Sequence, residues 1–340
     1  MIGFVIEVNY GKEFSMHTEL FSFMDFDVLW NGLCRPLLRL ILSISLGLAI
    51  GNIIEALHWG RFLAKVSSPL VRMAHLQDVS GAAFTMAFFS SISANSYLAE
   101  QYEQGKIVRK ELYFSNLLNS TPVLFLHLPS LFFLAVPFLG KAAFWYVGII
   151  VSAALFRTIG TVIAGRFILP PTPEGCVTCE LDDNAPKDAK EVFQRVVSRF
   201  MRRIRRVLLV TIPVYTIVFM LNRFGVFEAL NDVIGGDNGF LPFINPEAAG
   251  VLILSLAAEI TASMAAAGAL LTDGSIQAKD VVLALLAGNI LSSPMRALRH
   301  QLATYMGIFP SRLALWLIFC NQSVRVVSLV LFTLAYYFWV

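Results

Sequence analysis

Two arginines lie near the middle of long apolar runs, Arg157 in the first half of the chain and Arg325 in the second. An arginine at the centre of a membrane helix costs about 2.5 to 3.5 kcal/mol even on insertion scales, so it has to face protein, water or a ligand. Asn321 and Gln322 precede Arg325 by one helical turn and share its face. These residues predict a charged, polar site at mid-bilayer depth.

A second set of polar side chains precedes a proline at two places, "NSTP" (119–122) and "NILSSP" (289–294). Proline interrupts a helix, and an interruption at membrane depth is tolerated where it lines a cavity. The half-helix that follows points its partial positive charge at whatever fills that cavity. We expect the tips of these breaks to bind a solute through Asn119, Ser120, Thr121, Asn289, Ser292 and Ser293.

The charges near these breaks favour an anionic solute. Arg299 and His300, with Arg296, follow the second break, and His127 lies in the matching arm of the first. The alternative for the two arginines is that they reach the cytoplasmic headgroups and set the depth of the segment. Glu259, in another apolar run, has the opposite sign. It is expected to couple protons or gate the site, or else to pair with an arginine and lock helices together.

The elements that must position these groups are membrane helices. The chain has 340 residues, of which 57% are hydrophobic and 14% charged, far from the soluble average of about 25% charged residues. Several apolar runs approach the ~20 residues of a spanning helix and show no strand-like alternation. The sequence therefore predicts an all-α, polytopic membrane protein. The runs are 37–57, 81–98, 142–169, 207–221, 248–271 and 313–340.

The two halves of the chain match each other. At a shift of 169, residues 81–112 align without gaps to 250–281. Ordered matches of Gly, Lys and mid-helix Arg indicate an internal repeat with copies at 35–169 and 205–340. The matched pairs include Gly105 and Gly274, Lys110 and Lys279, Trp145 and Trp316, and Arg157 and Arg325.

We expect the copies to be inverted. If each broken segment is a re-entrant hairpin, a copy has an odd number of full crossings and the second copy is turned over. The first loop of copy one is basic, whereas its counterpart in copy two is acidic, in keeping with opposite sides. Eight full crossings in parallel copies is the competing topology.

Two further segments flank the copies. Residues 1–34 form a polar, interfacial segment, and residues 170–204 form a loop whose basic second part has one apolar helical face. The positive-inside tendency predicts that this loop is cytoplasmic, and the amphipathic part should lie along the membrane before turning in. The protein is expected in the plasma (inner) membrane. Its CxxC pair, Cys176 and Cys179, is interpreted as ordinary thiols, with metal binding as the alternative.

The stretch 285–327, "LLAGNILSSPMRALRHQLATYMGIFPSRLALWLIFCNQSVRVV", with the preceding "PEAAGVLILSLAAEITASMAAAGALLTDGSI", resembles the nucleoside-recognition or gate domain of prokaryotic membrane proteins. This domain is also seen in the membrane part of ferrous iron transporters and in concentrative nucleoside transporters. The resemblance implies an inverted-repeat, transporter-like fold without giving a substrate. No GxxxxGK[ST] motif is present, so GTP-driven iron uptake is not encoded.

The resulting hypothesis is a secondary transporter or permease for a small polar solute, with an anion favoured. A non-transporting membrane scaffold or accessory subunit, and a divalent metal permease, stay open as alternatives. No catalytic triad or HExxH motif points to an enzyme, and no cofactor or resident metal is expected. The expected partners are the solute and the lipid bilayer, without nucleic acid, and homo-oligomerisation is left open.

Overall fold

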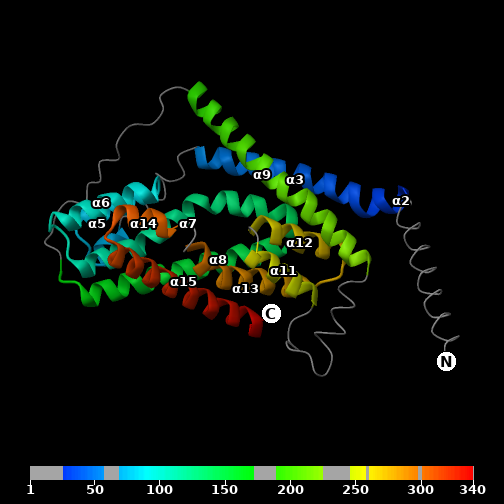
Figure 1. The fold of residues 1–340 in the computed structure, drawn as a ribbon. Helices are drawn as coiled ribbons and strands as arrows, with labels where there is room; N and C mark the ends of the chain where they lie inside the picture. The colour runs from blue at the N-terminus through cyan, green and yellow to red at the C-terminus, as the bar shows by residue number, and fades with distance from the viewer. Residues whose placement is uncertain are drawn as a thin grey trace.

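The computed structural model describes residues 26–56, 69–171, 189–224, 246–257, 260–297 and 301–339. Within these ranges the chain is helical and contains no β-strand (Figure 1). In chain order the helices are α2 (Phe26–Leu29), η1 (Trp30–Cys34), α3 (Arg35–Ala56), α5 (Asp78–Ala87), α6 (Ser91–Glu103), α7 (Arg109–Leu139), α8 (Ala142–Ile168), α9 (Ala189–Arg223), α11 (Pro246–Ala257), α12 (Ile260–Asp273), α13 (Ala278–Arg296), α14 (Leu302–Ile308) and α15 (Ser311–Trp339).

Three of these helices, α7, α8 and α15, are long and apolar enough to cross a membrane. Their outer faces expose large apolar side chains such as Phe156, Ile159 and Phe319. A water-soluble protein rarely exposes so many, whereas a bilayer solvates them. The predicted all-α membrane protein is confirmed.

Both halves contain a pair of short helices that pack against each other, α5 with α6 and α11 with α12. The turn between α5 and α6 lies at Phe88–Ser90. There the Ser90 side chain accepts a hydrogen bond from the Ser93 backbone N–H (3.1 Å) and caps α6. Each pair then packs against the helix that follows it, α7 or α13. Each of these regions was predicted to be one apolar run that approaches the length of a spanning helix. This prediction is wrong for 81–98, which is divided between α5 and α6.

One large apolar core joins the two halves. Tyr146 of α8, Met264 of α12 and Leu286 of α13 are all fully buried in it. Helix α12 is the most enclosed element, since every residue from 261 to 270 is buried. Its alanine-rich sequence favours the helix and allows neighbouring backbones to approach closely. The site described below therefore rests on a shared, densely packed bundle.

The helix break predicted at 119–122 is wrong. Helix α7 runs without interruption from Arg109 to Leu139 and contains three prolines. A proline removes only one backbone hydrogen bond, and neighbouring helices and Ser/Thr side chains can satisfy the freed groups in a buried helix. Close to Pro122 the Ser120 hydroxyl donates to the Leu117 carbonyl (2.6 Å), and a hydrogen bond between the Thr121 and Thr158 hydroxyls ties α7 to α8.

The second predicted break, at 289–294, is also wrong. Helix α13 continues through Ser292–Pro294 to Arg296, and α14 begins at Leu302. Residues 289–293 therefore lie inside a helix and not at its tip. They offer side chains to their surroundings but no free backbone amides, which removes the dipole argument for binding at these two places.

The basic segment before the second half also differs from the prediction. Helix α9 carries it directly into the apolar residues 207–221 as one continuous helix, with no turn between the two parts. In Figure 1 the N-terminal end of α9 projects away from the bundle, while its middle crosses α3. Continuity of helix formers across the junction explains the absence of a turn.

The turns before α7 and α13 are built alike. Gly105 and Gly274, the matched glycines of the sequence alignment, both have a φ of 72°. The next residue donates its N–H back across the end of the preceding helix, Lys106 to the Gln101 carbonyl (3.0 Å) and Ser275 to the Leu270 carbonyl (3.1 Å). Glycine suits this left-handed position because it has no Cβ. The two alignment positions therefore adopt the same local structure.

A buried carboxylate ties the start of α5 to the start of α7. Glu111, which is 3% exposed, accepts hydrogen bonds from the Gln77 backbone N–H (2.9 Å) and the Ser80 hydroxyl (2.8 Å). Ser115 donates in turn to the Ser80 oxygen (2.7 Å). The carboxylate thus satisfies a free N–H at the first turn of α5 from a neighbouring helix.

We expect Glu111→Ala to lower the free energy of unfolding by about 2 kcal/mol, because it strands a buried N–H and a buried hydroxyl. The change should appear as a lower midpoint of thermal unfolding in detergent. Glu103→Ala, at an exposed position on α6, is the matched control and should stay within about 0.5 kcal/mol. Equal midpoints for the two variants would contradict this role.

Candidate binding cavity

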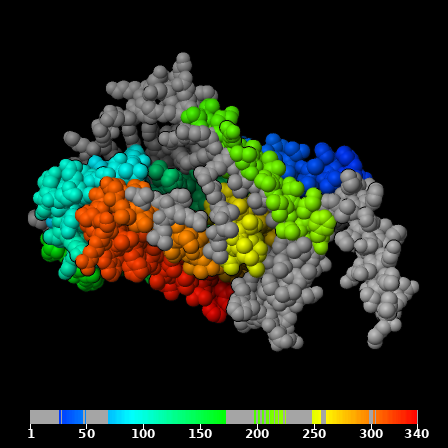
Figure 2. All heavy atoms as spheres, in the orientation of Figure 1, coloured from blue at the N-terminus to red at the C-terminus, as the bar shows by residue number. Residues whose placement is uncertain are grey.

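A cavity of about 450 Å³ lies where the two halves meet. Its walls come from α6, α7 and α8 of the first half and from α14 and α15 of the second. The short helix α14 packs beside α6, although about two hundred residues of chain separate them, and Figure 2 shows their surfaces in contact. A volume of this size is typical of small-molecule sites.

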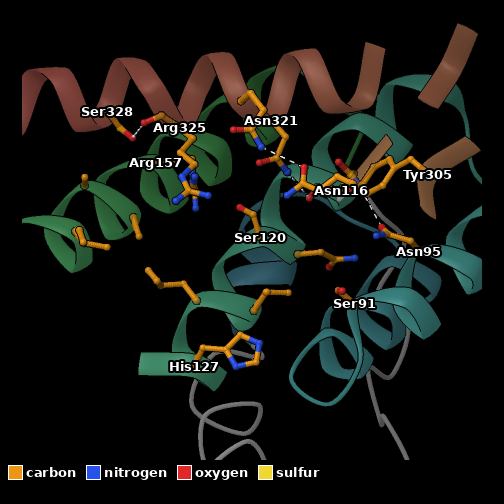
Figure 3. Close-up of a pocket in the computed structure, with 18 of the residues that line it drawn as sticks. Ser91, Asn95, Asn116, Ser120, His127, Arg157, Tyr305, Asn321, Arg325 and Ser328 are labelled. Atoms are coloured by element: carbon orange, nitrogen blue, oxygen red, sulfur yellow. Dashed lines mark hydrogen bonds between the residues drawn. The ribbon is translucent and has the colours of Figure 1, made fainter. Parts of the chain in front are cut away.

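The two mid-helix arginines meet in this cavity. Arg157 of α8 and Arg325 of α15 both line it, and Figure 3 shows their side chains converging from neighbouring helices. Arg157 is only 7% exposed, and its Nε is buried without a hydrogen-bond partner. The predicted pairing of the two arginines in space is therefore what the structure shows.

Arg325 is held in place by the asparagine of the second half. Asn289 Oδ1 accepts hydrogen bonds from Arg325 Nη2 (3.3 Å) and from Arg296 Nη2 (2.8 Å). An amide oxygen has two lone pairs, so this atom is fully used. The Arg296 side chain therefore points back along its own helix toward Asn289, which also binds Arg325.

A chain of amides and hydroxyls supports the second wall. Ser293 donates to Gln322 Oε1 (2.7 Å), and Gln322 Nε2 donates to Gln301 Oε1 (3.1 Å). These two hydrogen bonds link α13, α15 and the residue before α14. Gln322 and Gln301 line the cavity, whereas Ser293 positions Gln322 from behind.

The opposite end of the cavity is rich in neutral polar groups. Asn116 Nδ2 donates to Asn95 Oδ1 (3.0 Å) and to the Tyr305 hydroxyl (3.0 Å). Asn321 Nδ2 reaches the Asn116 backbone carbonyl at 3.5 Å. In Figure 3 this cluster lies at one end, the arginine pair at the other, and Ser120 between them.

Three amide atoms of this region have no hydrogen-bond partner. They are Asn116 Oδ1, Asn119 Oδ1 and Asn119 Nδ2, on side chains only 2% and 5% exposed. Leaving a buried polar group unpaired costs about 1 to 3 kcal/mol. Native proteins retain such groups chiefly where a ligand or water completes them.

The charge of the cavity is positive. Its described lining contains two arginines and a histidine, His127, and no aspartate or glutamate. Two guanidinium groups this close repel each other, and the low dielectric of a membrane strengthens the repulsion. An anion placed between them would replace repulsion by charge-assisted hydrogen bonds.

The structure brings six of the predicted binding residues to the cavity wall: Asn119, Ser120, Arg157, Asn321, Gln322 and Arg325. Asn289 and Ser293 contact wall residues from behind. Thr121 bonds Thr158 away from the lining, and Ser292 is buried with its hydroxyl unpartnered. Glu259, Arg299, His300 and the CxxC pair lie outside the described residues, so the roles predicted for them stay predictions.

Three residues of the cavity wall were not predicted from the sequence: Asn116, Gln301 and Tyr305. Asn116 had a detectable signal, since it lies three residues before Asn119 on the same helical face. Tyr305 and Gln301 had none, because they belong to the short segment around α14 and reach the cavity only through the packing of α14 on α6.

The chain is similar to three proteins of Methanocaldococcus jannaschii. The uncharacterized protein MJ1556 is 28% identical over 306 residues, 88% of this chain and 92% of that protein. The uncharacterized protein MJ0880 is 27% identical over 312 residues (88% and 96%), and the uncharacterized protein MJ0871 is 26% identical over 263 residues (77% and 81%). No protein-family model and no solved structure matches the chain. Because these relatives are uncharacterized, the function has to come from the chemistry of the cavity.

Proposed function

We propose that the chain is a secondary transporter or permease that moves a small polar anion across the plasma (inner) membrane. The carrying observation is a cavity between the two halves with two guanidinium groups and no acidic side chain in its described lining. Such a cavity attracts anions and disfavours cations. Residues of this kind inside a bilayer are costly and mark solute pathways.

The architecture supports a carrier built from two inverted copies. Each half has a single helix, a pair of short helices, a helix that contains at least one proline, and a long apolar helix, in the same order, with the short helix α14 added before the last helix of the second half. The members of the pairs have 10, 13, 12 and 14 residues, too few for the ~20 that a crossing needs. We infer that α5–α6 and α11–α12 are the re-entrant hairpins, which leaves three crossings per half and turns the second copy over.

The two halves also differ in a way that a carrier requires. Asn289 holds Arg325, whereas its counterpart Asn119 has both amide atoms free and no bond to Arg157. Alternating access exchanges the conformations of two inverted halves around one site. We infer that the opposite state pairs Asn119 with Arg157 and releases Arg325.

Sidedness follows from charge. The basic residues of 170–204 and of the start of α9 favour a cytoplasmic location of that loop. The resemblance to gate-domain proteins agrees with a transporter, but it contributes no substrate. The metal-permease alternative depends on Glu259, which lies outside the described residues, and the described wall offers no carboxylate to a cation.

The proposal is tested by uptake into proteoliposomes with matched solutes. Lactate and lactamide have nearly the same shape, but only lactate carries a charge. We expect uptake or counterflow of carboxylates at least about 10-fold above that of the neutral amides, since the arginine pair contributes only to the anion. Uptake no greater than in protein-free liposomes for every solute, together with a stably co-purifying partner protein, would favour the scaffold alternative.

A further inference from the structure

The cavity holds more than a positive charge, and its second end restricts the kind of anion that fits. Arg157 and Arg325 occupy one end, whereas Asn95, Asn116 and Tyr305 occupy the other (Figure 3). A ligand that meets only the arginines leaves the second end empty. The second end is therefore placed to recognise a different part of the same ligand.

The unpaired atoms define what this second part is. Asn116 Oδ1 and Asn119 Oδ1 are acceptors without a donor, and Asn119 Nδ2 is a donor without an acceptor. Both side chains are more than nine-tenths buried and line the cavity. The two free carbonyl oxygens can be satisfied only by O–H or N–H groups.

An inorganic anion without O–H groups, such as sulfate, does not meet this requirement. Sulfate has acceptor oxygens only, so it can bind the guanidinium groups and Asn119 Nδ2 but not the two amide oxygens. The cavity of about 450 Å³ is also far larger than such an ion, since one water occupies about 30 Å³. Apolar side chains at Val123, Leu124 and Ile150 complete the wall and suit a short carbon skeleton.

We infer that the ligand is a small organic carboxylate that carries hydroxyl or amino groups on its carbon chain. Its carboxylate lies between Arg157 and Arg325, and its O–H or N–H groups donate to Asn116 and Asn119. This inference rests on the proposed function and narrows it from anions in general to hydroxy or amino acids.

The inference is tested by binding of matched probes to the purified full chain in detergent or nanodiscs. Malate and succinate differ by one hydroxyl, and sulfate serves as the inorganic probe. A site that hydrogen-bonds a ligand hydroxyl discriminates strongly against the analogue that lacks it. We expect malate to bind about 10- to 100-fold more tightly than succinate, and sulfate to bind most weakly.

The matched variant is Asn119→Leu, which keeps the size of the side chain and removes its amide. It should bring the ratio of malate to succinate affinity within about 3-fold, whatever it does to the affinity for succinate itself. Gln104→Leu, at an exposed position just after α6, should leave the ratio unchanged. If Asn119→Leu does not fold, the wild-type ratio decides alone.

The two proposals fail in different ways. Equal affinities of the wild type for malate and succinate would overturn this inference and leave the anion proposal standing. Absence of saturable binding of every anion would overturn the proposed function, and the inference with it. A wild-type preference for malate that persists in Asn119→Leu would also overturn the role given to this asparagine.

Discussion

Replacing Arg157 by alanine is expected to lower kcat/KM for uptake of an anion about 100-fold or more. A guanidinium–carboxylate contact of the bidentate kind is worth several kcal/mol in a site shielded from water, and about 2.7 kcal/mol corresponds to a factor of 100. Arg157→Lys keeps the charge but loses the planar fork, so we expect an intermediate loss of about 10-fold. Initial rates in proteoliposomes measure both.

The same substitution should leave the protein as stable as the wild type, or more stable. Arg157 is buried beside another arginine, and its Nε has no partner. Removing a buried charge without a counter-charge relieves repulsion and desolvation. A residue whose removal abolishes transport and raises the midpoint of thermal unfolding serves a ligand and not the fold.

Arg166→Ala provides the control, because this arginine is exposed in the last turn of the same helix. Arg166→Ala should change the rate of uptake by less than a factor of about 2 and the free energy of unfolding by less than about 0.5 kcal/mol. Wild-type uptake by Arg157→Ala would contradict the charge assignment, and so would a large loss of stability that accompanies the loss of uptake.

Gly268→Ala is expected to cause a large loss of stability from a single added methyl group. A Cβ at Gly268 of α12 would lie 2.8 Å from the Phe138 carbonyl oxygen and 3.3 Å from the Phe138 Cα, both of the α7 backbone. Backbone atoms cannot rotate away, so the two helices have to separate. Such overpacking costs about 1 to 3 kcal/mol or more, which should lower the midpoint of thermal unfolding by about 5 °C.

The chain offers a matched control for this packing. Gly148 lies in the second turn of α8, and no atom of a neighbouring element comes within 4 Å of its hypothetical Cβ. Gly148→Ala therefore adds the same methyl group with no clash, and the better helix propensity of alanine should raise stability by about 0.5 to 1 kcal/mol. Opposite signs for the two variants are predicted, and equal effects would contradict the close contact of α12 with α7.

The arginine pair could be predicted from the sequence because its cause is local. Each arginine lies in an apolar run, where a charge is costly unless it faces protein, water or a ligand. Matched positions of a repeat are brought together by symmetry. Asn321 and Gln322 followed from helical spacing alone. These residues line the cavity in the structure.

The helix breaks could not be predicted because their cause is tertiary. Prolines 122, 129 and 137 fall within the continuous helix α7, where neighbouring helices hold the chain in place. The real interruption of the first half, at Phe88–Ser90, has no proline or glycine. Only the Ser90 cap of α6 gave a signal, and in a serine-rich stretch that signal is ambiguous.

The central claim, a water-filled and positively charged cavity between the two halves, is tested most directly by the reactivity of one cysteine. Ser120 lies in the cavity between the arginine pair and the asparagine cluster. In a chain whose four native cysteines are replaced, Ser120→Cys should react with an anionic methanethiosulfonate at least about 10-fold faster than with a cationic one of similar size, relative to an exposed reference cysteine at Glu103. Arg325→Ala should reduce that preference. No reaction with either reagent, or faster reaction with the cationic one, would contradict the account.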